Sequence, residues 1–227
     1  MKETYFTLEN IDMQAAEMLA AVRHLQKSAA FTLEPNKAAL LVLDMQRYFL
    51  EETSHAFIPS AAAIIPRIQC LQDTFVNYRL PIVQTRHINT IQNAGLMNSW
   101  WKELIVETNP LSEISSHIQH KHAAVFVKPQ YDAFFNTDLE QWLSGRHVSQ
   151  VVIAGVMAHL CCETTARSAF MRGFQVFFTV DATASYTRQF HQASLLNLSH
   201  GFAVPVLSEQ VLAAFPAINN KESQYES

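Results

Sequence analysis

Continuous apolar runs alternate with helix-spaced apolar positions along most of the chain. The run "AALLVLDM" at 38–45 has no polar position before Asp44, which is typical of a strand buried on both faces. Residues 61–79 instead place apolar side chains at helical spacing. The runs predict strands at 38–45, 81–87, 123–128, 150–155, 175–182 and 203–208. The helical spacing predicts helices at 9–29, 61–79, 137–145, 162–173, 188–201 and 208–215.

This alternation predicts an α/β fold. We expect three α/β/α layers around a Rossmann-like, six-stranded, mostly parallel sheet, with an additional N-terminal helix. The chain should divide into an N-terminal helical extension at 1–36, a domain at 37–216 and a polar tail at 217–227. The extra helix either packs on the domain or contacts a partner subunit, and packing is the favoured alternative.

Composition narrows the class of protein. The 227 residues suit one large domain, and 49% hydrophobic with 16% charged residues is typical of a globular chain. A net charge of −4 without a Lys/Arg run argues against a nucleic-acid partner. The apolar runs are shorter than the ~20 residues of a membrane helix, so we expect no membrane partner and a cytoplasmic protein. Three cysteines without CxxC or HExxH predict neither a disulfide framework nor a metal site.

Three chemically useful residues stand at the ends of predicted strands, where parallel sheets carry their active sites. Asp44 ends the first strand, Lys128 ends the third, and Cys161 follows the fourth at a helix start. A helix start and a nearby ammonium favour a thiolate. Asp44 is suited to accept the thiol proton and return it to a leaving amine, while backbone N–H groups receive an oxyanion. The set predicts acyl transfer on a small-molecule amide or related carbonyl.

Each of these residues also has a structural explanation. Asp44 could cap a helix, Lys128 could be a solvated strand end, and Cys161 could be a small buried side chain. Their convergence on one predicted edge of the sheet favours the functional interpretation.

Three motifs carry a family resemblance that covers residues 38–208. They are "ALLVLDMQRYFL" (39–50), "VFVKPQYDAFFNTDLEQWL" (125–143) and "VVIAGVMAHLCCETTARSAFMRGFQVFFTVDATAS" (151–185). In this order they resemble the Asp, Lys and nucleophile motifs of the isochorismatase-like hydrolases. The resemblance implies an α/β/α hydrolase domain at 37–216.

The resemblance also implies roles for individual residues. Asp44, Lys128 and Cys161 would be the catalytic residues, and Cys162 would pack as a small side chain. A cis peptide would join Val156 to Met157, and the backbone N–H groups of Met157 and Cys161 would form an oxyanion hole.

The family has two branches with different chemistry. Amidase members hydrolyse C–N bonds through a cysteine thioester, whereas isochorismatase members protonate a vinyl ether with the Asp and carry Gly at the cysteine position. In "GVMAHLC", Ala158 and His159 resemble the isochorismatase branch, and Cys161 resembles the amidase branch. We favour amide, carbamoyl or imide hydrolysis, because the cysteine decides whether covalent chemistry is possible. Vinyl ether hydrolysis is the alternative, and a non-catalytic binding protein is a third.

No metal or other cofactor is expected. Nicotinamidase members of the family bind a metal through Asp-x-His and a further His, whereas the second strand here ends in "TRHIN". There is no Asp two residues before His87. Arg86 and His87 either face the pocket, where they would meet an anionic or polar substrate group, or cap the strand end.

The substrate pocket is expected to take side chains from several motifs: Gln46, Tyr48, His87, Trp100, Tyr131 and Phe134. Trp100 and Trp101 lie in the long connection at 88–122, and adjacent aromatics point apart, so at most one faces the site. An aromatic pocket favours a small planar or apolar acyl group. The resemblance implies a homo-oligomer, a dimer or higher, which light scattering of a 25.7 kDa monomer would contradict.

Overall fold

A six-stranded parallel sheet forms the centre of the molecule. The computed structural model describes residues 2–26 and 31–216. Within them the strand order is β3-β2-β1-β4-β5-β6, and every neighbouring pair is parallel. The strands are β1 (Ala38–Leu43), β2 (Ile82–His87), β3 (Ala124–Lys128), β4 (Gln150–Val156), β5 (Gln175–Ala184) and β6 (Val204–Val206). All six predicted strands are confirmed, with ends shifted by two residues at most.

The predicted helices are also confirmed: the helix at 188–201 has the predicted ends, and the other five are shorter than predicted. They are α1 (Ile11–Val22), α3 (Ala61–Asn77), α5 (Leu139–Ser144), α6 (Glu163–Met171), α7 (Arg188–Gly201) and α8 (Ser208–Ala213). Two single-turn helices, α2 (Arg47–Leu50) and α4 (Met97–Trp100), were not predicted. The helix expected at 9–29 ends at Val22 and continues as a 3₁₀ turn to Leu25, and positions 27–30 lie outside the described residues.

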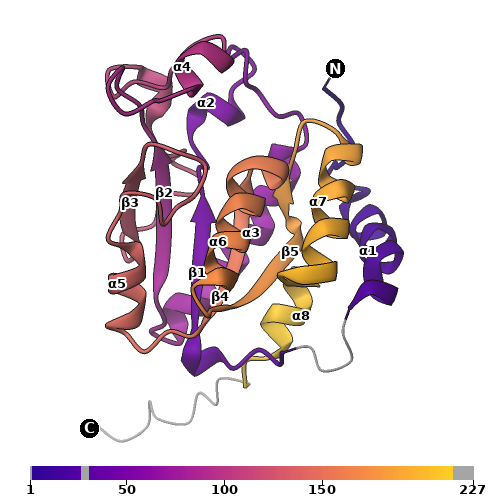
Figure 1. Cartoon of the computed structure of the whole chain (residues 1–227). Coiled ribbons are helices and arrows are strands. Elements are labelled where there is room, and N and C mark those ends of the chain that lie inside the picture. The colour runs from indigo at the N-terminus through magenta and orange to yellow at the C-terminus, as the bar shows by residue number, and fades with distance from the viewer. Residues whose placement is uncertain (1, 27–30, 217–227) are drawn as a thin grey trace, which may run out of the picture.

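Helices cover both faces of the sheet (Figure 1). α3 packs across β1, β2, β4 and β5 and contacts α8, whereas α6 and α7 pack together on the opposite face. Because both faces are covered, every residue of the central strands β1 and β4 is buried. Gly155 lies where these two strands approach most closely: a Cβ there would meet the Leu43 carbonyl oxygen at 2.1 Å. This contact fixes the end of β1, after which the chain continues into Asp44.

The N-terminal segment, defined here as residues 2–10, lies against the carboxyl end of the sheet. Its Glu3 N–H donates to the Tyr186 carbonyl at 2.9 Å, and the Tyr5 hydroxyl accepts from the Ser185 N–H at 2.8 Å. The Tyr5 N–H donates to the Ser60 hydroxyl at 3.0 Å. The helix that follows, α1, packs on α7 and β5, which confirms packing on the domain.

Across residues 2–26 and 31–216, the structure contains no helix of the length and hydrophobicity needed to span a membrane. The boundaries of the extension, domain and tail, the cytoplasmic location and the homo-oligomer stay predictions.

Candidate active site

The sheet brings Asp44, Lys128 and Cys161 together, and we call these residues the Asp–Lys–Cys cluster. Lys128 Nζ lies 2.7 Å from Asp44 Oδ2 and 3.3 Å from Cys161 Sγ. Lys128 also donates to the Gln130 carbonyl at 2.9 Å. Asp44 and Lys128 are fully buried, and Cys161 is 5% exposed. The three predicted residues therefore form one buried, charge-paired group, in which the lysine touches both partners.

The Asp44 carboxylate is held by its backbone and by β2. Asp44 has a φ of +51°, a conformation that non-glycine residues rarely adopt. Its N–H donates to the Thr85 hydroxyl at 3.1 Å, and that hydroxyl donates to Asp44 Oδ1 at 2.6 Å. Thr85 was missed in the sequence, because a threonine near the end of a strand looks like an ordinary strand residue. Because Thr85 binds Oδ1, the other carboxylate oxygen of Asp44, Oδ2, faces Lys128.

Burial sets the protonation of the cluster. Burial lowers the pKa of Lys128, but Asp44 and Cys161 raise it further, so the pKa ends above its ordinary value and the group is an ammonium. Burial and then the Asp44 charge raise the pKa of Cys161, and Lys128 only partly opposes them. The resting sulfur is therefore a thiol. Lys128 favours the thiolate, as expected, but burial and the Asp44 charge oppose it more strongly.

A π-helical turn, Ala158–Cys162, joins β4 to α6 and orients the two adjacent cysteines differently. Cys161 lines a pocket, while Cys162 is fully buried in the hydrophobic core, as expected. The Val156–Met157 peptide is cis, as the family resemblance implies. The Met157 N–H donates to no other residue in the described part of the chain, and Met157 lines the same pocket. This N–H is therefore available to a ligand.

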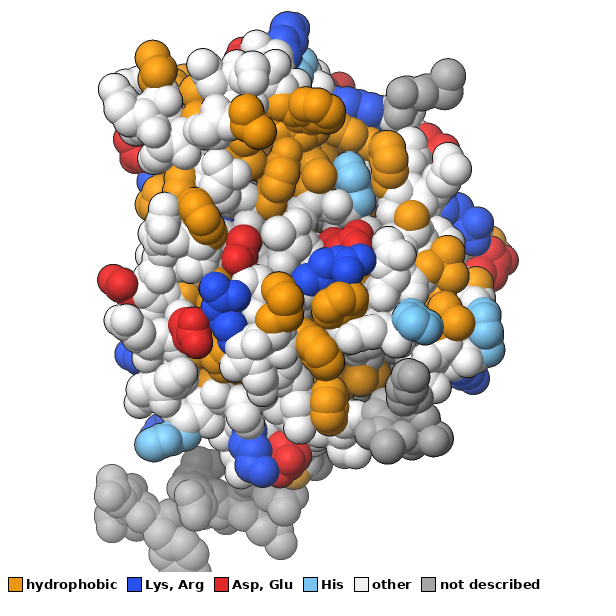
Figure 2. All heavy atoms as spheres, in the orientation of Figure 1, with side chains coloured by type: hydrophobic (Ala, Val, Ile, Leu, Met, Phe, Trp, Pro, Cys, Tyr) orange, Lys and Arg blue, Asp and Glu red, His pale blue; other side chains and the backbone are white. Residues whose placement is uncertain are grey.

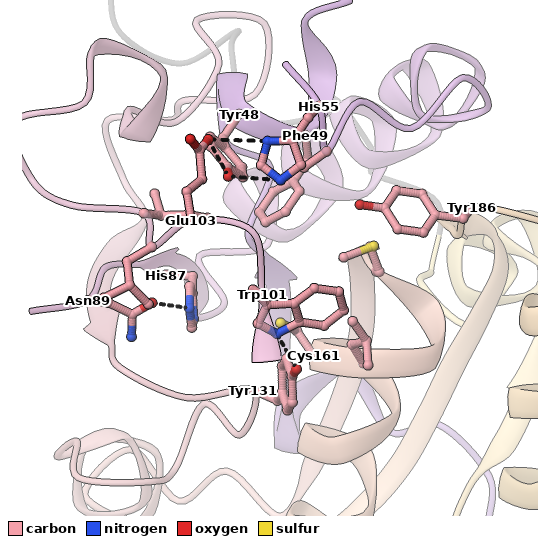
Figure 3. Close-up of a pocket in the computed structure, with 15 residues that line it drawn as sticks. Tyr48, Phe49, His55, His87, Asn89, Trp101, Glu103, Tyr131, Cys161 and Tyr186 are labelled. Carbon is pink, nitrogen blue, oxygen red and sulfur yellow. Dashed lines mark hydrogen bonds and ion pairs between the residues drawn. The ribbon is translucent and has the colours of Figure 1, made fainter. Parts of the chain in front are cut away.

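The pocket that reaches Cys161 is lined mostly by aromatic and aliphatic side chains (Figure 3). It opens to solvent at one side and has Cys161 in its wall. The expected Tyr48, His87 and Tyr131 line it, together with the unpredicted Tyr186. Hydrophobic side chains also gather on the outer surface at the end of the molecule that carries α2 and α4 (Figure 2).

Two predicted aromatic residues lie outside the pocket. Trp100 is 78% exposed, and its neighbour Trp101 lines the pocket instead, with its Nε1–H donating to the Tyr131 hydroxyl at 2.7 Å. Phe134 is buried and stacks on Phe174 with a ring separation of 5.8 Å. Trp100 and Phe134 were wrong as pocket residues, because one points to solvent and the other into the core.

Two predicted polar residues also act elsewhere. Gln46 is fully buried: its amide donates to the Ser112 carbonyl at 2.6 Å and accepts from the His87 N–H at 2.8 Å. Gln46 therefore ties loops together and does not line the pocket. Arg86 pairs with Glu107 at 3.3 Å and with Glu113 at 2.9 Å. It is occupied away from the pocket, so the structure does not place it against a substrate anion.

His87 faces the pocket as a neutral imidazole. Burial, and then the Lys128 charge, lower its pKa to about 4. Its Nε2 lies 2.9 Å from Asn89 Oδ1, and the Asn89 amide donates to the Pro129 carbonyl at 2.8 Å, so His87 Nε2 carries the proton. Among residues 2–26 and 31–216, no three His, Cys, Asp or Glu side chains converge to hold a metal. The His87–Asn89 pair does not fit the metal site of the nicotinamidase members.

His159, which resembles the isochorismatase branch together with Ala158, does not line the pocket. Its Nδ1 lies 2.5 Å from the Ser185 hydroxyl, and its ring stacks on Phe190 at 4.4 Å. Burial lowers its pKa to about 4, so the ring is neutral. These contacts give it a packing role.

Comparisons with known proteins agree with the fold and identify the family. The isochorismatase domain family model matches residues 38–210. Nicotinamidase 3 of Arabidopsis thaliana is 37% identical over 177 residues, covering 75% of this chain and 85% of that protein. Enterobactin synthase component B of Escherichia coli (strain K12) is 30% identical over 192 residues, covering 83% of this chain and 67% of that protein. The structure of a cysteine hydrolase from Pseudomonas syringae pv. phaseolicola 1448A has the same fold, with a TM-score of 0.76 and 24% sequence identity. The match covers 82% of this chain and 97% of that chain.

The fold and these relatives define the protein as an enzyme of the hydrolase class, with an α/β/α architecture. More specifically, the chain belongs to the isochorismatase family.

Proposed function

We propose that this hydrolase cleaves the C–N bond of a small planar carboxamide through a thioester on Cys161. The observation that carries the proposal is the 3.3 Å contact between Lys128 Nζ and the Cys161 sulfur, at the wall of an aromatic pocket. The likeness to Nicotinamidase 3, at 37% identity, supports an amide substrate. Carbamoyl and imide substrates are related members of the same chemical class.

In the first half-reaction, Cys161 attacks the amide carbonyl while Asp44 accepts the thiol proton. This transfer is required because the thiol pKa is raised. The oxyanion receives hydrogen bonds from the backbone N–H groups of Met157 and Cys161. As the C–N bond breaks, Asp44 returns the proton to the leaving amine. Lys128 holds the Asp44 carboxylate 2.7 Å away throughout.

In the second half-reaction, water attacks the thioester and Asp44 accepts a proton from it. The C–S bond then breaks, the carboxylic acid leaves, and Cys161 regains its proton. The products of a primary amide are ammonia and the acid, so the two half-reactions consume one water.

Vinyl ether hydrolysis with Asp44 as general acid is the second candidate. The likeness to enterobactin synthase component B and the Ala158–His159 pair favour it. The charge of the pocket argues against it, because isochorismate carries two carboxylates and no Lys or Arg of the described residues lines the pocket. Glu103, which does line it, would repel such a substrate.

The test is a release assay across small amides and isochorismate, with ammonia and pyruvate both measured. We expect ammonia from aromatic carboxamides, and a loss of at least about 10³-fold in the Cys161→Ala variant. After treatment with an electrophilic amide analogue, intact mass should show an adduct that is lost in Cys161→Ala, and fragmentation of the modified peptide should place it on Cys161, with Cys162 and the exposed Cys70 as internal controls. Pyruvate release that survives Cys161→Ala would instead support the second candidate.

A further inference from the structure

A hydrogen-bonded polar group lines the mouth of the pocket, and we call Tyr48, His55 and Glu103 the rim cluster. The Tyr48 hydroxyl donates to Glu103 Oε1 at 2.8 Å, and His55 Nδ1 lies 3.2 Å from the same oxygen (Figure 3). Both contacts converge on Oε1, so they fix the orientation of the carboxylate. Oε2 accepts no hydrogen bond from the residues that the structure describes, so it is left for a ligand.

The rim cluster also dominates the charge of the pocket. Among its described lining residues, Glu103 is the only one with a permanent charge, and the others are mostly aromatic or aliphatic. Its side chain is 49% exposed, so the charge lies at the mouth and remains hydrated in part. Low-dielectric walls strengthen its attraction for a cation that enters.

The position of the rim cluster separates it from the bond-breaking residues. Tyr48 follows the end of β1 in α2, His55 lies in the loop before α3, and Glu103 lies in the 88–122 connection. Among the described residues, no hydrogen bond or ion pair joins the three to Asp44 or Lys128, yet all of them share a pocket with Cys161. A substrate whose carbonyl reaches Cys161 therefore presents its other end to a different part of the same wall.

We propose that the rim cluster selects amides whose remote end carries a cationic or hydrogen-bond-donating nitrogen. This inference rests on the proposed function and adds the substrate class. The nitrogen would donate to Glu103 Oε2, while the aromatic walls hold the planar body of the substrate. A carboxylate at that end would meet Glu103 and be rejected.

Two amides of matched size test the proposal: 3-(aminomethyl)benzamide, which carries an ammonium, and the neutral 3-ethylbenzamide. The readout is the ratio of their kcat/KM values for ammonia release. We expect the wild-type enzyme to prefer the ammonium compound about tenfold and Glu103→Gln to lose that preference. Glu107→Gln is the matched control, because Glu107 lies in the same connection but pairs with Arg86 away from the pocket, and it should keep the wild-type ratio.

An equal ratio in the wild type and Glu103→Gln would overturn the proposal. So would a Glu107→Gln variant that loses the preference to the same extent, since a general effect of surface charge would then explain it.

A binding measurement separates this inference from the proposed function. Titration calorimetry with the Cys161→Ala variant compares the two amides without turnover. Tighter binding of the ammonium compound that disappears in Cys161→Ala/Glu103→Gln supports the rim cluster, even if neither amide is hydrolysed by the wild type, an outcome that would refute the proposed function alone. Turnover of both amides with equal binding would refute the rim cluster alone.

Discussion

The Asp–Lys–Cys cluster and the rim cluster line or border one pocket but are built in opposite ways. Asp44 and Lys128 are fully buried at the ends of β1 and β3, which pair with β2 on either side, so sheet register sets their geometry. Glu103 and His55 are 49% and 32% exposed and come from loops. A rigid sheet fixes the groups that need sub-ångström placement, whereas loops present the groups that meet the variable end of a substrate.

The largest expected effect is on the buried cluster. Asp44→Asn removes the proton acceptor and leaves the buried Lys128 ammonium without its counter-charge. We expect a loss of about 10³- to 10⁴-fold in kcat and of about 3–5 kcal/mol in the free energy of unfolding. An ammonia-release assay measures kcat, and urea denaturation measures the free energy of unfolding.

Glu103→Gln is the comparison variant for stability. Its carboxylate is half exposed, so we expect it to lower the free energy of unfolding by less than about 1 kcal/mol. If both variants lose the same stability, the contrast between a buried and a hydrated cluster fails.

The second-largest expected effect is a loss of folding stability at acid pH, caused by His87. His87 has a folded pKa of about 4, against 6.5 when unfolded. Between these values the unfolded chain binds a proton that the folded chain does not, so the free energy of unfolding falls as pH drops through that window. From pH 6.5 to 4.5 the contribution is about 2–3 kcal/mol, and it is fully present above pH 6.5.

His159 and His191 have pKa values lowered to about 4 and about 3, so they too lower the free energy of unfolding as the pH drops. The His87→Gln variant isolates the pocket histidine from them. Urea denaturation across the pH range should give it a shallower acid slope than the wild type, and identical slopes would refute the assignment.

The smallest expected effect distinguishes the tryptophan that lines the pocket from its exposed neighbour. Trp101→Phe removes the hydrogen bond to the Tyr131 hydroxyl, so KM for an aromatic amide should rise about fivefold. Trp100→Phe is the matched control, because that side chain is 78% exposed, and its KM should stay at the wild-type value. Equal KM changes in both variants would show that the connection acts as a whole.

The centre of the fold was predictable from the sequence for a physical reason. Strands that are covered on both faces must be apolar along their length, so continuous apolar runs such as "AALLVLDM" mark β1 and β4 within two residues. The same reasoning found Asp44, Lys128 and Cys161, because strand ends in a parallel sheet share one edge.

Other site features depend on tertiary contacts that no local pattern encodes. Which tryptophan of the Trp100–Trp101 pair faces inward depends on the rotation of a single-turn helix. The raised pKa of Cys161 depends on burial. His55 and Glu103 belong to no motif and meet only because their loops lie over one pocket.

The N-terminal segment lies outside the 38–210 match, yet it holds two residues of the pocket wall. Lys2 Nζ donates to the His55 carbonyl at 2.5 Å and lies 4.6 Å from the centre of the Tyr186 ring. The extension is also part of the core, because Phe6 and Met18 are buried with the residues of the matched region. Removing it would therefore uncover the core and release the outer side of the pocket wall together.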